Sequence, residues 1–307
     1  MNASPKNSTV VRSNPVPWSL RAAVRMGSML APERTATRAL ELFCTPLPSS
    51  RTRAEQASLQ GAQLQRMRIG DQRIALYQWG DPATQPRVLI SHGWSSFGLR
   101  FTPWVAALRE KGFSVLAFDQ PGHGRNESSR ITLPGFVETA LAVGRQHGPF
   151  AAAIGHSLGG AAVAAAMSEG LAIERAVLIA PAADAVSASR RFSRAIALPE
   201  SQRARMQQRL ERSSGRSMDS LAIHRIGPAL GQPALIVHDL ADTDVPWEEG
   251  ERYARFWPRA RLLSVSGLGH HKIVNDPTVI AAGLAFIGGA TVGNRVVSTH
   301  ALVYGLA

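Results

Sequence analysis

The chain has 307 residues, of which 45% are hydrophobic, and it carries a formal net charge of +12. This length and hydrophobic content suit a sizeable core in one α/β domain with additions. The single cysteine, Cys44, excludes an internal disulfide and any multi-cysteine metal site, and it favours a reducing compartment. The charge comes from 31 arginines and three lysines spread over nearly every segment, without a nucleic-acid motif. We therefore expect a plainly basic surface and no nucleic-acid partner, with attraction to acidic substrates or membranes as the alternative.

The first 60 residues read as a leader followed by a helical extension. Residues 1–17 combine three prolines with polar neighbours and lack the charged start and apolar core of a secretory signal. We predict a disordered leader, with an organellar transit peptide as the alternative, and a cytoplasmic protein. Residues 18–29 and 32–43 are predicted to form two short helices within an N-terminal helical extension over 18–60, which the prolines at 45–50 bring to an end. Because two such helices would otherwise leave apolar side chains uncovered, we expect them to lie against the main domain, with Cys44 packed in a core.

From residue 64 onward, short apolar runs alternate with helical patterns. Residues 64–69 and 73–79 flank a Gly-Asp turn, which predicts an antiparallel hairpin. Six further strands are predicted at residues 87–91, 113–118, 150–154, 175–180, 233–237 and 261–265. Helices are predicted between most of them, at residues 103–111, 134–146, 161–170, 247–256 and 277–286. This alternation predicts an α/β fold with a mostly parallel central sheet and helices on both faces, over residues 64–287. Ligand chemistry in such a sheet lies at the carboxyl ends of the strands.

Two segments depart from this alternation. Residues 182–230 are longer than one crossover helix requires, and we interpret them as a small helical cap over the site, with a helix at residues 200–217. This helix carries a stripe of four arginines, Arg205, Arg209, Arg212 and Arg216, which is either a solvated face or a guide for anionic substrates or surfaces. No segment of the sequence resembles a membrane span, because the longest weakly apolar run, residues 151–167, is rich in alanine and is interrupted by His156 and Ser157. The tail, residues 288–307, is either a short added strand or disordered.

The run Gly-His-Ser-Leu-Gly-Gly at residues 155–160 lies between a predicted strand and a predicted helix. Small residues two before and two after Ser157 allow a sharp turn that holds its hydroxyl at the tip. The first amides and the positive dipole end of the following helix point toward any oxyanion formed there. Ser157 is therefore the candidate nucleophile.

A second signal follows the strand at residues 87–91, where His-Gly-Trp at residues 92–94 begins a loop rich in small residues. With the Ser157 turn and Asp-Gln-Pro-Gly-His-Gly at residues 119–124, this loop resembles the α/β-hydrolase superfamily over about residues 68–287. The resemblance implies the α/β-hydrolase fold and an oxyanion hole made by the amides of Trp94 and Leu158. The aspartate and histidine of the 119–124 loop are expected to be structural.

The resemblance also supplies partners for Ser157. Residues 238–246 resemble the family's acid loop, whose Asp-x-x-Val-Pro pattern selects Asp242 as the triad acid. Asp244 is the runner-up, followed by Asp239 and Asp184. In Gly-Leu-Gly-His-His at residues 267–271, which follows the last strand, the resemblance assigns the base to His270, with His271 as the competing choice.

The resulting hypothesis is a serine hydrolase that cleaves a carboxylic ester of a small-molecule acyl substrate, without cofactor or metal. Thioesterase, C–C hydrolase, peptidase and perhydrolase chemistry remain alternatives, as does a non-catalytic binding protein on a hydrolase scaffold. For the pocket, Phe97 is predicted to belong to an aromatic wall. His156 either touches the substrate or fills space beneath the turn.

Overall fold

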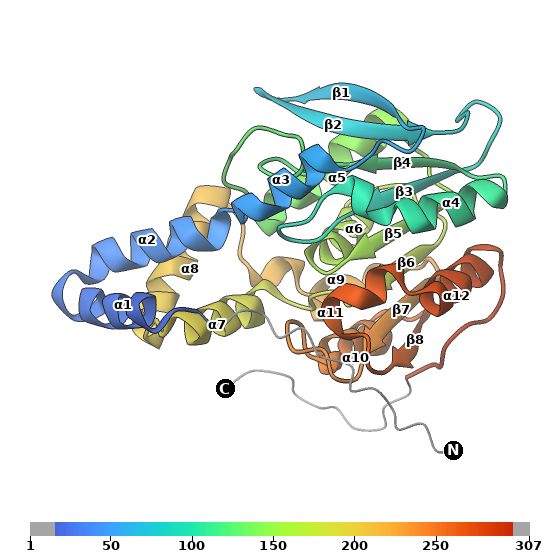
Figure 1. Ribbon diagram of the computed structural model, residues 1–307. Helices are drawn as coiled ribbons and strands as arrows, with labels where there is room; N and C mark the ends of the chain where they lie inside the picture. The colour runs from blue at the N-terminus through green and yellow to red at the C-terminus, as the bar shows by residue number, and fades with distance from the viewer. Residues whose placement is uncertain (1–15, 297–307) are drawn as a thin grey trace, which may run out of the picture.

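The computed structural model describes residues 16–296, and its centre is an eight-stranded sheet (Figure 1). The strands are β1 Gln63–Ile69, β2 Gln72–Trp79, β3 Arg87–Ser91, β4 Ser114–Phe118, β5 Ala152–His156, β6 Ala176–Ile179, β7 Ala234–Asp239 and β8 Ala260–Val265. Their order across the sheet is β1-β2-β4-β3-β5-β6-β7-β8. The first two strands form the predicted hairpin, β2 pairs antiparallel with β4, and the other pairs are parallel. The predicted mostly parallel sheet is confirmed.

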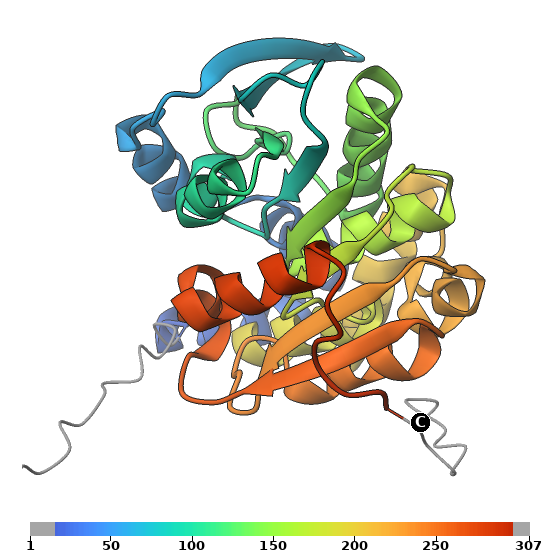
Figure 2. The same cartoon turned by 90° about the vertical axis from the view of Figure 1, so that its right-hand side faces the viewer.

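Helices cover both faces of the sheet (Figures 1 and 2). One face carries α4 Thr102–Glu110 and α12 Pro277–Ile287, and the other carries α5 Leu133–His147, α6 Leu158–Ser168 and α10 Trp247–Phe256. Successive residues of a strand point to opposite faces, so Leu89 of β3 packs in the α5 and α6 layer, whereas Val88 and Ile90 pack in the α4 and α12 layer. Both sides of each central strand are thus buried, which explains the near-continuous apolar runs in the sequence.

Six short helices lie in the connections between these elements: η1 Gly98–Phe101, η2 Asp219–Leu221, α9 Ile223–Ile226, η3 Gly227–Ala229, α11 Gly269–Lys272 and η4 Ile273–Asn275. Isolated bridges join Phe150 to Ile173 and Leu262 to Asn294. The second bridge adds the start of the predicted tail to the edge of β8. The predicted leader up to residue 15 and the tail from residue 297 lie outside the described residues.

The N-terminal helices are α1 Trp18–Leu30, α2 Pro32–Cys44 and α3 Pro48–Gln56. The first two helices contact the domain over residues 64–287, as we expected, and they do so mainly through the segment predicted as a cap. There they pack on α7 Ala185–Ile196 and α8 Glu200–Ser214 (Figure 1). Apolar side chains hold the group together: the rings of Phe43 and Phe192 lie 5.1 Å apart, and Met206 is fully buried beside them. The apolar side chains of α2 and Val24 of α1 thus face those of α7 and α8 in one cluster.

The arginines of the predicted basic stripe stay partly exposed, and most of them form ion pairs. Arg205 and Arg209 both form ion pairs with Glu33 of α2, and Arg216 pairs with Glu169 at the end of α6. Three of the four stripe arginines therefore connect α8, or the turn directly after it, to neighbouring helices. Cys44 is buried against Leu210, and burial raises the pKa of its thiol to about 11.

Within residues 16–296, none of the helices has both the length and the apolar character needed to cross a bilayer.

Candidate active site

Ser157 lies at the sharp turn between the end of β5 and the start of α6. Its backbone has φ 52° and ψ −123°, a combination that L-residues rarely adopt. The neighbouring glycines are needed for space: a Cβ on Gly159 would lie 2.2 Å from the carbonyl oxygen of His92, and one on Gly155 would lie 2.6 Å from the Cα of Gly160. The predicted turn therefore forms, with its small residues in close contact with the neighbouring backbone.

Three side chains from different strand ends meet at this turn. His270 Nε2 lies 3.0 Å from Ser157 Oγ, and His270 Nδ1 lies 2.7 Å from Asp242 Oδ2. An ionised carboxylate can only accept, so Nδ1–H donates to Asp242, and the free lone pair of Nε2 accepts from the Ser157 hydroxyl. This arrangement makes His270 able to remove the hydroxyl proton and to stay oriented while it does so.

Asp242 is held in its ionised form. Its side chain is fully buried, and its Oδ1 accepts hydrogen bonds from the amides of Asp244 and Val245, each 2.9 Å long. Burial by itself raises the pKa of this carboxyl, but the hydrogen bonds from His238 and His270 outweigh it and lower the pKa below the ordinary value. The carboxylate is thus available to stabilise a positive charge on His270.

The alternative acids and base have other partners. Asp244 pairs with His271 at 3.2 Å, beside the first pair but nearer to the surface. Asp239 accepts from the amides of Ala241 and Leu268, where it fixes the loops after β7 and β8. Asp184 caps α7 and pairs with Arg252 at 2.6 Å. The structure therefore brings Asp242 and His270, and not these alternatives, to Ser157.

The loop that begins with His92 lies directly against the serine. A Cβ on Gly93 would lie 3.0 Å from Ser157 Cβ, a contact tight enough to push the two segments apart by a few tenths of an ångström. The buried His92 ring fixes this loop, because its Nε2 accepts from the Gln120 amide at 3.0 Å and its Nδ1–H donates to the Gly93 carbonyl at 2.7 Å. Burial lowers the pKa of His92 to about 4, so the ring stays neutral.

The two predicted oxyanion donors, Trp94 and Leu158, directly follow Gly93 and Ser157, the two residues that are in contact. Leu158 is the first residue of α6, so its amide has no partner within the helix. Within residues 16–296, no protein acceptor is found for the Trp94 amide either. Both amides are therefore free to bind a ligand oxygen next to Ser157.

The two predicted substrate-binding side chains are both buried. His156 is 2% exposed, its Nε2–H donates to the His270 carbonyl at 3.0 Å, and its ring lies 4.7 Å from that of His270. This position corresponds to the alternative in which His156 fills space beneath the turn and supports the base. Phe97 is 9% exposed and packs in the α4 and α12 layer, whereas Trp94 is half-buried and stacks on Phe136.

His238 is a site residue that the sequence reasoning missed. It is fully buried at the end of β7, donates from Nε2 to the Val245 carbonyl at 2.9 Å, and has the same nitrogen 3.5 Å from Asp242 Oδ2. The available signal was a polar side chain at the end of an otherwise apolar strand, four residues before Asp242. His238 holds the acid loop in place from beneath.

A parallel sheet with a serine turn, a histidine and a carboxylate at its strand ends defines the α/β-hydrolase class. The profile of the alpha/beta hydrolase family matches residues 88–282, and the chain belongs to this family. No curated protein sequence matches the chain.

Solved structures share the fold at low sequence identity. The thioesterase domain from the curacin biosynthetic pathway is 21% identical, with a TM-score of 0.55, over 74% of this chain and 98% of its own. An esterase from Rhodococcus is 18% identical, with a TM-score of 0.54, over 75% of this chain and 99% of its own. Mouse alpha/beta hydrolase domain-containing protein 10 is 18% identical, with a TM-score of 0.59, over 74% of this chain and 97% of its own.

Proposed function

We propose that this protein is a serine hydrolase that cleaves a carboxylic ester or a related acyl bond through an acyl-enzyme. The observation that carries the proposal is the continuous hydrogen-bonded series from Ser157 through His270 to Asp242, with contacts of 3.0 Å and 2.7 Å. A serine hydroxyl is a weak nucleophile unless a base accepts its proton, and here the base and its orienting acid are both in contact range.

In this mechanism Ser157 Oγ attacks the substrate carbonyl while His270 Nε2 takes the hydroxyl proton. Asp242 stabilises the imidazolium, and the amides of Trp94 and Leu158 bind the oxyanion of the tetrahedral intermediate. His270 then donates the proton to the leaving group, and the acyl-enzyme forms. Water, activated by the same imidazole, attacks the acyl-enzyme and releases the acid.

A fluorophosphonate probe tests the nucleophile. We expect covalent labelling of the protein and none of Ser157→Ala, with the modified peptide containing residue 157. A folded protein that resists the probe would contradict the proposal. Two matched pairs test the partners: His270→Ala against His271→Ala, and Asp242→Asn against Asp244→Asn. The first member of each pair should lose about 10,000-fold in kcat, whereas the second should keep activity within about tenfold.

Substrate class is the finer part of the proposal. We favour a carboxylic ester, because the proposed nucleophile, proton shuttle and oxyanion donors would suffice for its cleavage without any further group. The fold also supports thioesterases, as the curacin pathway domain shows for that protein. A panel of matched acyl esters, thioesters and anilides with a common acyl chain separates these chemistries, and preference for the thioester would move the assignment to thioesterase.

A further inference from the structure

The first helix, α1, exposes an unusual amount of apolar surface. None of its residues is buried, and Trp18, Met29 and Leu30 are 81%, 83% and 79% exposed, with Met26 at 58%. Such side chains are normally covered in a soluble protein, and a contiguous exposed group of them marks an interaction surface.

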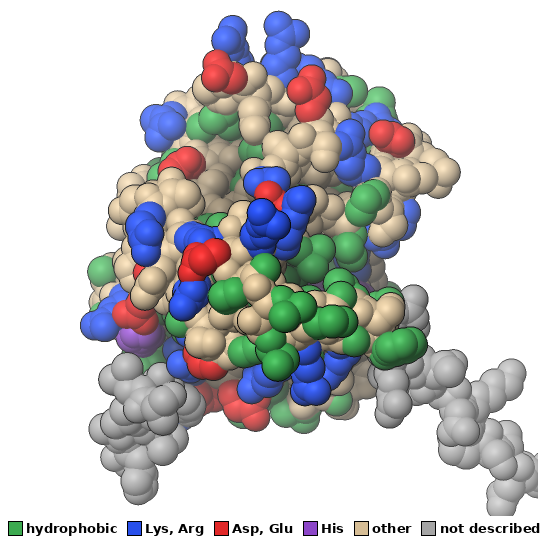
Figure 3. Space-filling model, turned by 90° about the vertical axis from the view of Figure 1, so that its left-hand side faces the viewer, with side chains coloured by type: hydrophobic (Ala, Val, Ile, Leu, Met, Phe, Trp, Pro, Cys, Tyr) green, Lys and Arg blue, Asp and Glu red, His purple; other side chains and the backbone are tan. Residues whose placement is uncertain are grey.

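These side chains lie on one face of the helix. At about 100° per residue, Trp18, Met26, Met29 and Leu30 fall within an arc of about 120°. Val24 lies on the opposite side and packs in the cluster with Ile196 and Met206 of the neighbouring helices. Figure 3 shows hydrophobic side chains gathered on this side of the molecule, with Lys and Arg side chains beside them.

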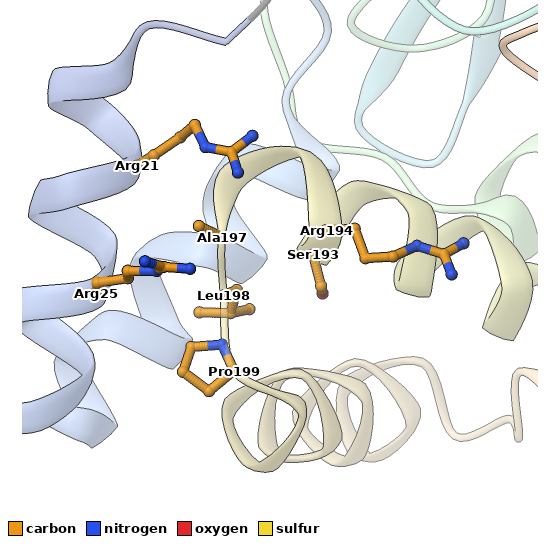
Figure 4. Close-up of a pocket in the computed structure, with 7 residues that line it drawn as sticks. All are labelled: Arg21, Arg25, Ser193, Arg194, Ala197, Leu198 and Pro199. Carbon is orange, nitrogen blue, oxygen red and sulfur yellow. The ribbon is translucent and has the colours of Figure 1, made fainter.

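The charged side chains of α1 itself are all positive. Arg21 and Arg25 lie on the flank of the apolar face, and α1 contains no Asp or Glu. Both arginines extend from α1 toward the turn at residues 197–199, where they line a hollow of about 340 Å³ that no acidic side chain lines (Figure 4). Arg21 donates to the Ala195 carbonyl at 3.2 Å, and neither arginine forms an ion pair within residues 16–296. Two guanidinium groups at a hollow of this kind suit the phosphate of an anionic ligand.

We propose that α1 docks this protein on an anionic lipid bilayer, with the apolar face at the level of the acyl chains and Arg21 and Arg25 on the lipid phosphates. Apolar insertion combined with cationic attraction is the pair of forces by which helices lie in a membrane interface. A second copy of the chain fits this surface less well, because a two-fold contact between identical α1 faces would place the arginines of one copy near those of the other. The inference does not depend on the proposed hydrolase activity.

The test is co-sedimentation of the full chain with vesicles of phosphatidylcholine alone or with roughly 30% phosphatidylglycerol. We expect binding to the anionic vesicles that weakens with added salt, and little binding to the neutral ones. Arg21→Gln/Arg25→Gln should lower the partition coefficient by roughly 30-fold, and Met29→Ser/Leu30→Ser by about tenfold or more. Because α1 has no buried residue, circular dichroism spectra and melting curves of both variants should match those of the parent.

Matched controls use exposed residues on other elements: Leu64→Ser on β1, and Arg73→Gln/Arg145→Gln on β2 and α5. These should leave vesicle binding unchanged. Equal binding to neutral and anionic vesicles, or binding that the α1 variants lower no more than the controls do, would overturn the proposal. So would a dimer in light scattering that Met29→Ser/Leu30→Ser converts to monomer, because a second copy would then occupy this face.

Discussion

Replacing Ser157 by glycine should stabilise the protein relative to replacing it by alanine, although both changes remove the proposed nucleophile. The backbone at Ser157, with φ 52° and ψ −123°, is a conformation that glycine adopts freely and that costs an L-residue about 1–3 kcal/mol. Alanine keeps the Cβ and therefore keeps this strain. Glycine removes it but adds about 0.5–1 kcal/mol of unfolded-state entropy. The difference leaves Ser157→Gly more stable than Ser157→Ala by about 0.5–2 kcal/mol.

The size of the expected shift follows from chain length. At about 2.1 cal/mol/K of unfolding entropy per residue, the whole chain has about 0.6 kcal/mol/K, so the two midpoints should differ by about 1–3 °C. Thermal and urea unfolding of both variants in one buffer measure this difference. Ala281→Gly is the control, because residue 281 is exposed in the helix α12, where glycine should cost about 1 kcal/mol. If that control behaves as expected and Ser157→Gly is still no more stable than Ser157→Ala, the turn is not strained and the reasoning fails.

Three further predictions concern stability. Burial lowers the pKa of His92 to about 4 and that of His123 to about 3, so on acidification the unfolded chain binds protons at these rings before the folded chain does. The free energy of unfolding should therefore be full above about pH 6.5 and should fall by about 2 kcal/mol for each ring on going from pH 7 to pH 5. Urea unfolding at these two pH values measures the loss. His238→Leu removes the hydrogen-bond donor to Asp242 and Val245 and should lower the free energy of unfolding in urea by about 1.5–3 kcal/mol. His238→Gln should restore part of this loss. Equal losses in the two variants would assign the effect to packing alone. Met206→Ala should lower the free energy of unfolding by about 2–5 kcal/mol. Glu33→Gln, which removes the exposed ion pairs to α8, should lower it by at most about 1 kcal/mol. A larger loss for Glu33→Gln than for Met206→Ala would show that ion pairs hold the four helices together.

The sheet could be predicted from the sequence because its signals are local. Each strand is a short apolar run whose length and flanking turn residues already separate it from a helix, and β3 has the bounds that these signals give. The helix α7 was missed, because serine and arginine residues dilute its pattern and its apolar face is completed only by α2 and α8. The helix α3 was missed for a different reason: Pro48, which reads as a breaker, stands at the first helical position, where proline is favourable.

The site could be predicted as far as its geometry depends on spacing along the chain. Glycines around Ser157 and in the loop before His270 mark the two turns, and the resemblance to a known family orders the candidate acids. The choice between Asp242 and Asp244 needs three dimensions, because each carboxylate lies beside a histidine and only one of these histidines reaches Ser157. The role of His238 depends on burial beneath the acid loop, which a single polar residue at a strand end does not reveal.

The helical extension is connected to the site as well as to the cap helices. At the end of α2 the Cys44 carbonyl accepts from the Ile131 amide at 3.0 Å, and just before α3 the Leu47 amide donates to Ser95 Oγ at 2.9 Å. Ser95 follows the proposed oxyanion donor Trp94 directly and has a positive φ of 49°, a conformation that needs support from its surroundings. His92 fixes the same loop from the sheet side. The loop is thus held by His92 from the core and by Leu47 from the helical extension, so the extension contributes to the geometry in which an oxyanion would be bound.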